Sequence, residues 1–292
     1  MFSLSVIFQA VAGGLMSGGT YALVAVGLTL IFGVMRVINF AHGEFLMLAM
    51  YLAYFGWSVL GVDPYWMVLI APLVLALLGS VFFQYLTRYS MGAPEINQMA
   101  VTLGASLLLQ NAALLAFKGD NQIVNLARAT DSIMLSAVTL QVPQLMAATV
   151  SVVLMGAVYL LLTRTDLGLM MRATAQSSEG AALSGIDLSR VYRWAMALGI
   201  ATLGFAGPLI LPTMYVNPNI GTLFTLKAFV IVIAGGLGSV PGALLGGLLV
   251  GLTESVAGVW LPGAAASAIP FVFLVIVMIW RPQGLLKSGG RR

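Results

Sequence analysis

Apolar residues follow one another along this chain in long runs, and polar residues are confined to short intervals between them. About 20 apolar residues are enough for a helix to cross a bilayer. The runs are apolar on every face and do not alternate, which favours membrane helices over the strands of a β-barrel. We predict nine spans, at about residues 6–32, 40–60, 65–86, 96–117, 142–162, 192–211, 223–239, 243–260 and 268–280.

The composition strengthens this prediction. Of the 292 residues, 60% are hydrophobic and 8% are charged, whereas soluble domains carry about 25% charged residues. The spans leave only short loops, so residues 1–292 are predicted to form a single all-α, polytopic membrane domain with about 8–9 transmembrane helices. The chain contains no cysteine, which excludes disulfides, thiolate metal sites and cysteine nucleophiles.

Basic residues predict the orientation. The longest interval that a membrane interior would reject runs from Arg164 to Arg193, and alternating spans place it on the same side as Arg36, Arg88 and the tail 281–292. Ten of the 13 Lys and Arg then lie on one side. Because these residues collect in cytoplasmic loops, we expect the N-terminus outside and the C-terminus in the cytoplasm. The three remaining bases are Lys118 and Arg128 outside and Lys227 within a span.

Two stretches, 33–45 and 235–242, interrupt apolar runs with glycine, proline or polar residues. Broken segments in corresponding places of two halves are typical of transporters with inverted repeats. The two stretches do not resemble each other residue by residue, so their placement alone supports a repeat, and the second break could be re-entrant. In the first break, Asn39 is expected to cap the second helix, and Arg36 to pair with Glu44.

Glycines four residues apart, the spacing that lets membrane helices approach closely, are expected to serve helix packing. They are Gly14 and Gly18, Gly242 and Gly246, and Gly247 and Gly251.

Polar residues inside spans are costly and mark candidate functional positions. In the fourth span such residues recur every four positions, on one helix face. Together with Asn39 they are candidates for lining a substrate path, offering hydrogen bonds to a small zwitterion. The alternative is hydrogen bonding between helices, at about 0.6 kcal/mol each. The fourth-span residues are Gln98, Thr102, Ser106 and Gln110.

Lys227 and Glu254 are the charges placed deepest in spans. An isolated charge at the membrane centre costs about 3 kcal/mol on insertion scales, so we expect the two side chains to form an ion pair. An ion-coupled carrier would also need such titratable groups.

Several chemistries are excluded by missing motifs. None of the three lysines lies in Gly-x-x-x-x-Gly-Lys-Ser/Thr, so the chain has no P-loop for ATP. His42 is the single histidine, and His42-Gly-Glu44 lacks the cysteines that complete a deaminase zinc site. No metal site, cofactor or catalytic role is therefore expected in this chain, and any ATP must be bound by another subunit.

The segment 164–193 contains a short, interrupted helix-like stretch from Leu169 to Ser184, followed by Gly185 as a C-terminal cap. Its apolar face is weak. It is either a solvated connector between two spans or a short helix that docks in a partner's groove.

Three motifs carry a family resemblance. The stretch 27–45, GLTLIFGVMRVINFAHGEF, resembles the signature of the permease subunits of bacterial branched-chain amino acid ABC importers. GGLGSVPGALLGG at 235–247 is similar to their second hallmark, and RATAQ at 172–176 with ALSGI at 182–186 resembles their cytoplasmic coupling segment. Family members often have Asn or Asp where this chain has Ser177.

The resemblance implies partners and roles. Such a permease sits in the bacterial inner membrane, pairs with a second, homologous permease, binds two cytoplasmic ATPase subunits and receives substrate from a periplasmic binding protein. It implies no nucleic-acid partner. The resemblance assigns transmission of ATPase movement to Arg172, Ala175, Glu179, Leu183 and Gly185.

The function predicted from the sequence is therefore a non-catalytic permease for branched-chain or related amino acids. One alternative is import of urea or short amides on the same architecture. A second, from another class, is an ion-coupled secondary carrier, and a third is an intramembrane enzyme built on His42.

Overall fold

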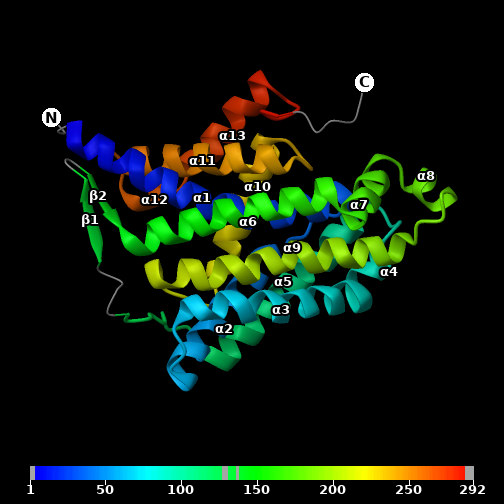
Figure 1. Cartoon of the computed structure of the whole chain (residues 1–292), viewed down its shortest axis with the longest axis horizontal. Helices are drawn as coiled ribbons and strands as arrows, with labels where there is room; N and C mark the ends of the chain where they lie inside the picture. Colours follow the sequence, from blue (N-terminus) through cyan, green and yellow to red (C-terminus); the bar gives the residue numbers. More distant parts are fainter. Residues whose placement is uncertain (1–3, 127–130, 136–137, 287–292) are drawn as a thin grey trace.

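The computed structural model describes residues 4–126, 131–135 and 138–286, and these form a bundle of long helices (Figure 1). Arg128, Lys287, Arg291 and Arg292, which contributed to the predicted orientation, lie outside the described residues. Nine apolar helices within the described ranges coincide with the nine predicted spans: α1 (Leu4–Met35), α2 (His42–Leu60), α3 (Pro64–Phe82), α5 (Glu95–Phe117), α6 (Val142–Arg164), α9 (Leu188–Ile210), α10 (Ile220–Gly235), α11 (Val240–Ala257) and α13 (Ile269–Trp280).

Shorter elements connect the apolar helices. A π-helical turn and α4 prolong α3, and a 3-10 turn follows α9. The connecting elements are η1 (Phe83–Thr87), α4 (Arg88–Ser90), β1 (Ser132–Leu135), β2 (Val138–Gln141), α7 (Asp166–Gln176), α8 (Ser178–Leu183), η2 (Leu211–Thr213) and α12 (Gly263–Ala266).

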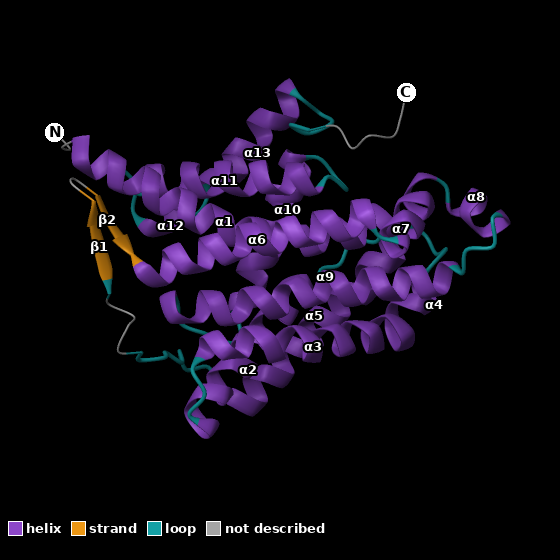
Figure 2. Cartoon of the chain, viewed as in Figure 1, coloured by secondary structure: helices purple, strands orange, loops and turns teal. Residues whose placement is uncertain are grey.

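The predicted all-α, polytopic membrane fold is confirmed, with one small exception. Residues 132–141 contain an antiparallel hairpin in which Ser132 pairs with Gln141 (orange in Figure 2). The side chain of Gln9 in α1 donates to Thr139 O at 2.7 Å and accepts from Thr139 N at 2.7 Å. The hairpin is thus fixed by a residue 130 positions away, which no local pattern indicates.

Seven helical segments of the described chain are long and apolar enough to cross a membrane, with α3, η1 and α4 counted as one. The helices α10 and α13 have only 16 and 12 residues. At 1.5 Å per residue, α10 is about 24 Å long, less than the hydrocarbon thickness of about 30 Å. Two of the nine predicted spans, α10 and α13, are therefore shorter than a helix that crosses the whole hydrocarbon layer.

Helix α1 lies at the centre of the bundle, packed against α11, α9, α6 and α10. Its interface with α11 is built on glycines. A Cβ added to Gly18 would lie 2.7 Å from Gly247 O and 2.8 Å from Leu248 Cα, and one added to Gly14 would lie 2.8 Å from Gly251 O. The backbones of the two helices are therefore in direct contact, which is the packing expected from the glycine spacing.

The first break carries the chain back into the bundle. After α1 ends at Met35, residues 36–41 are non-helical, and His42 at the start of α2 has Nε2 2.9 Å from Val24 O. Val24 precedes the end of α1 by eleven residues, or about 16 Å of helix. The N-terminus of α2 therefore lies deep inside the bundle rather than at its end.

The capping role predicted for Asn39 is wrong in detail, because Ala41 occupies the N-cap position of α2. Asn39 instead accepts a hydrogen bond from the backbone N–H of Ala41 at 3.1 Å, two residues along the chain. It supports the irregular backbone of the break, not the first helical turn.

The second break is a tight turn between α10 and α11. Gly236 and Gly238 adopt positive φ angles of 109° and 79°, and Ser239 caps α11 by accepting from Gly242 N at 3.1 Å. A Cβ on Gly33 would lie 3.1 Å from Gly238 Cα, so the two breaks are in contact. The turn does not re-enter the bundle as the first break does, and an inverted repeat stays a prediction.

The contact between α1 and α11 is expected to tolerate no side chain at Gly18. Replacing Gly18 by Ala places a methyl group against fixed backbone and should lower the free energy of unfolding by about 1–3 kcal/mol. Thermal unfolding of the purified protein in detergent measures this loss.

Gly156→Ala is the matched control, because Gly156 lies in a helix and has no atom within 4 Å of the added Cβ. It should leave stability unchanged or raise it by up to about 1 kcal/mol. Equal stability of the two variants would contradict the proposed backbone contact.

Candidate functional site

The coupling segment predicted at 164–193 consists of two capped helices at one end of the bundle, which we call the arginine end (Figure 1). Thr165 caps α7 by accepting from Gly168 N at 3.1 Å, and Ser177 caps α8 by accepting from Gly180 N at 3.0 Å. Asn, Asp and Ser are about equally good N-caps. Ser177 therefore fills structurally the position where Asn or Asp is common in the family that the motifs resemble.

Helix α8 ends in a Schellman motif. Gly185 has φ 83°, its N–H bonds Ala182 O at 3.0 Å, and Ile186 N bonds Ala181 O at 3.0 Å. This left-handed position favours glycine. Leu183, at the end of the helix, is 91% exposed, and Glu179 is exposed beside it.

A cleft of about 1140 Å³ opens beside α7 at the arginine end. Its walls come from the end of α1, the first break, the start of α5, α7 and the turn before α11. Arg172 and Ala175 of α7 line this cleft, and Gln98 of α5 lines it as well. The structure thus brings two predicted coupling residues and one predicted path residue to a common cavity.

The polar row of α5 faces the bundle. Thr102 Oγ1 donates to Ile38 O at 2.9 Å, Ser106 Oγ to Glu44 Oε1 at 3.2 Å, and Gln110 Nε2 to Asn219 Oδ1 at 3.0 Å. Gln98 bonds Ala93 O at 2.9 Å within its own segment. Thr102, Ser106 and Ala113 are the buried residues of α5, so polar contacts hold much of this helix against the bundle.

Asn39 is fully buried in the first break and does not line the cleft. Its Oδ1 accepts from Ala41 N, whereas Nδ2 has no hydrogen-bond partner among the described residues. Asn39 lies one residue beyond Ile38, to which Thr102 donates. Asn39, Thr102 and Ser106 thus lie around the break, whereas Gln98 lines the cleft and Gln110 bonds Asn219.

Glu44 is a functional candidate that the sequence did not single out. The expected pair with Arg36 is wrong: Arg36 is exposed, whereas Glu44 is fully buried and accepts from Ser106 and, at 3.4 Å, from Thr222. The break carries Glu44 inward, away from the arginine end. An acid within an apolar segment is the signal that would have identified it.

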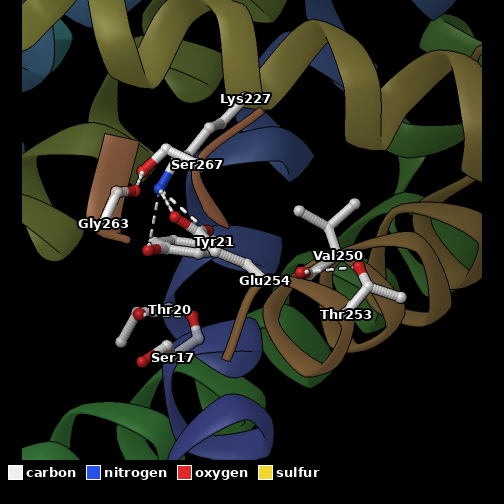
Figure 3. A network of polar contacts seen from close by, with 9 residues as sticks. All are labelled: Ser17, Thr20, Tyr21, Lys227, Val250, Thr253, Glu254, Gly263 and Ser267. Atoms are coloured by element: carbon white, nitrogen blue, oxygen red, sulfur yellow. Dashed lines mark hydrogen bonds and ion pairs between the residues drawn. The ribbon is translucent and has the colours of Figure 1, made fainter. Parts of the chain in front are cut away.

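Lys227 and Glu254 lie together in the structure (Figure 3). Lys227 Nζ is 2.8 Å and 2.9 Å from the two carboxylate oxygens of Glu254, and 3.0 Å from Tyr21 OH. The ammonium also lies 4.5 Å from the centroid of the Tyr21 ring. All three N–H donors of the lysine can thus be satisfied, and the group joins α1, α10 and α11.

Removing one member of this pair should be more damaging than removing both. Glu254→Gln leaves a buried ammonium without its counter-charge and should lower the free energy of unfolding by about 3–5 kcal/mol. The double variant Lys227→Met/Glu254→Leu should recover most of that loss, because no buried charge remains. Thermal unfolding in detergent provides the comparison.

Tyr21→Phe is the control for the hydroxyl alone, and it should cost about 1 kcal/mol. The contrary outcome concerns Lys227→Met/Glu254→Leu. If its loss of stability equals the sum of the losses from removing each charge alone, the two charges do not stabilise each other.

No group of three or more His, Cys, Asp or Glu in the described ranges is arranged to hold a metal ion. The predicted site residues form four groups: the cleft with α7, the exposed helix α8 with its C-terminal glycine, the polar contacts of α5, and the ion pair.

Comparisons with known proteins match almost the whole chain. The family described as "Branched-chain amino acid transport system / permease component" matches residues 10–278. The high-affinity branched-chain amino acid transport system permease protein BraD of Pseudomonas aeruginosa is 30% identical over 294 residues, covering 95% of each chain. LivH of Escherichia coli, described in the same words, is 29% identical over 295 residues, covering 95% of this chain and 94% of LivH.

A more distant relative is the probable branched-chain amino acid transport permease protein LivH of Methanocaldococcus jannaschii, 25% identical over 284 residues, with 94% of this chain and 90% of the relative covered. No solved structure matches the chain significantly. The family match and the relatives confirm the resemblance carried by the sequence motifs. This multi-pass membrane chain belongs to the permease components of branched-chain amino acid transport systems.

Proposed function

We propose that this chain is the permease subunit of an ATP-driven importer of branched-chain or related amino acids in a bacterial inner membrane, and that it forms the path with a second, homologous permease. The observation that carries the proposal is the cleft shared by α7 and α5. Movement of α7 changes the walls of the cavity that Gln98 lines, so a motor acting on α7 acts on the path.

In this proposal, partner subunits bind and hydrolyse the ATP that drives transport. The chain has no P-loop, so two cytoplasmic ATPase subunits bind the ATP, and a periplasmic protein delivers the substrate. The arginine end faces the cytoplasm, in keeping with its bases. There α8 presents Leu183, 91% exposed, on a helix capped at both ends, which fits a short helix docking in a groove.

The charges around the cleft favour an amino acid over urea. Arg36, Arg172 and Glu95 all line it, so both signs of charge are available to a zwitterion, whereas neutral urea or a short amide would need neither. Lys227 and Glu254, the two charges that the sequence offered to an ion-coupled carrier, are engaged with each other and with Tyr21.

Reconstitution tests this proposal directly. Proteoliposomes containing this chain, the second permease and the ATPases should take up radiolabelled L-leucine when ATP and the loaded binding protein are present. Labelled urea should not accumulate. Full uptake by the permeases without ATPase subunits, driven by a proton or sodium gradient, would overturn the proposal in favour of the ion-coupled carrier.

Substitutions at the C-terminal end of α8 test its coupling role. Gly185→Ala forces a side chain into a left-handed position and should disturb the cap that orients Leu183. Leu183→Ser removes the exposed apolar side chain. Each is expected to lower binding-protein-stimulated ATP hydrolysis and uptake at least about 10-fold, a loss of about 1.4 kcal/mol at the docking surface.

Gly61→Ala is the matched control for backbone strain. Gly61 also has a positive φ, 67°, and open space around a Cβ, but it terminates α2 outside the coupling segment. It should retain coupled transport despite a similar local strain. Normal ATP stimulation and uptake in both coupling variants would refute the role assigned to α8.

A further inference from the structure

Glu44 occupies the middle of the bundle. Its carboxylate accepts from Ser106, which is the twelfth of the 23 residues of α5. Eleven residues on either side correspond to about 16 Å of helix in each direction. The carboxylate therefore lies about as far from one end of α5 as from the other.

The cleft at the arginine end stops just short of this carboxylate. Ile38 and Gln98 line the cleft, and the carbonyl of Ile38 accepts from Thr102. Ser106 lies one helical turn beyond Thr102, a distance of about 6 Å along α5. Glu44 thus follows directly after the inner end of the cavity.

On its other side, the carboxylate lies close to the surface of the chain. Thr222 donates to Glu44 Oε1 and is itself exposed. The hydrogen bond between Gln110 of α5 and Asn219, the residue before α10, lies further in the same direction and is also exposed. Glu44 consequently separates the cleft from an exposed region between α5 and the start of α10.

The carboxylate has unused hydrogen-bonding capacity. Ser106 and Thr222 both bind Oε1, whereas Oε2 is buried and has no partner among the described residues. An ionised carboxylate accepts about four hydrogen bonds. Gly221 packs directly against this group, since a Cβ there would collide with Oε2 and lie 2.9 Å from Oε1. The surroundings thus leave room for the carboxylate but supply only hydroxyl donors.

Within the described part of the chain, no basic side chain bonds Glu44. Lys227 is held by Glu254 and Tyr21, and Arg36 lies exposed at the cleft. The break holds further polar atoms without partners in the described structure, Asn39 Nδ2 and His42 Nδ1. The ligand that best complements a buried carboxylate with only neutral donors is a cation with several N–H groups.

We propose that Glu44 binds the ammonium group of the amino-acid cargo at the midpoint of the path, after α5 moves away from the break and breaks the Ser106–Glu44 hydrogen bond. The inference rests on the proposed function and adds to it a residue that recognises the cargo. Thr102 and Ser106 hold α5 at the break by hydrogen bonds, beside the partly buried Ala105 and Leu109, and a helix with so few contacts is suited to move. An alkylammonium offers three N–H donors, enough to satisfy Oε2 and replace Ser106.

The first experiment detects the contact without relying on transport. The assembled complex in lipid nanodiscs, hydrolysing ATP, is treated with dicyclohexylcarbodiimide, and labelled carboxyls are located by mass spectrometry. L-Leucine should reduce labelling of Glu44 at least about 3-fold, and 4-methylpentanoate, the same skeleton without the amino group, should not. Equal protection by both compounds, or no labelling of Glu44 at all, would overturn the proposal.

The second experiment separates recognition from structure. Glu44→Gln should lower L-leucine uptake at least about 10-fold while binding-protein-stimulated ATP hydrolysis stays within about 2-fold, and Glu44→Asp should restore part of the uptake. Gly156→Ala, which adds a methyl group in open space on α6, should transport normally. Parallel loss of uptake and ATP hydrolysis in Glu44→Gln would indicate a structural residue and contradict the inference.

Uptake by the wild-type complex separates a failure of the proposed function from a failure of the role assigned to Glu44. A wild-type complex that fails to transport L-leucine counts against the proposed function itself. A wild-type complex that transports it, beside a Glu44→Gln variant with unchanged uptake, refutes only the role of Glu44.

Discussion

A membrane interior provides no water to bind exposed backbone or polar side chains, so the protein itself must satisfy every non-helical segment at that depth. Residues 36–41 are such a non-helical segment, because they carry the chain from the end of α1 back to the level of Val24. The surrounding helices must therefore supply hydrogen-bond partners for their backbone groups. Thr102 satisfies the Ile38 carbonyl, Thr225 accepts from Gly43 N at 2.8 Å, and His42 contacts the Val24 carbonyl. The positions of α5 and α10 follow from these contacts.

The same requirement explains the two kinds of packing in the bundle. Helix α1 meets α11 through glycine backbones, and Lys227 joins these helices to α10 with its donors satisfied by Glu254 and Tyr21. Close backbone contact leaves no space for sliding. Helix α5 instead buries little besides Thr102 and Ser106, and hydrogen bonds of this kind contribute about 0.5–1.5 kcal/mol each. These hydrogen bonds are the polar contacts of α5 with the break, and Phe117 at the end of the helix packs on Tyr51 and Phe55.

The sequence predicted what depends on local pattern. The apolar runs predicted the nine helices, and Gly185 predicted the end of α8. The cost of an isolated charge in a membrane predicted that Lys227 pairs with Glu254. Features set by distant contacts were not predictable. The depth of α2 depends on a contact between His42 and Val24, and the hairpin depends on Gln9. Arg36 and Glu44 were expected to pair across the break, whereas the break carries Glu44 inward to Ser106 and leaves Arg36 exposed.

The arrangement of the breaks gives a physical reason for coupling at a distance. Gly33 and Gly238 touch where the breaks meet, and this contact forms part of the wall of the cleft that α7 also lines. In the proposed function, a displacement of α7 therefore changes a cleft whose walls include both breaks. The glycine contact joins the two breaks rigidly, because backbone in contact with backbone cannot relax by rotating a side chain. Where α5 meets the break, Thr102 and Ser106 hold the helix by hydrogen bonds, and at its far end Phe117 packs on Tyr51 with ring centroids 4.2 Å apart.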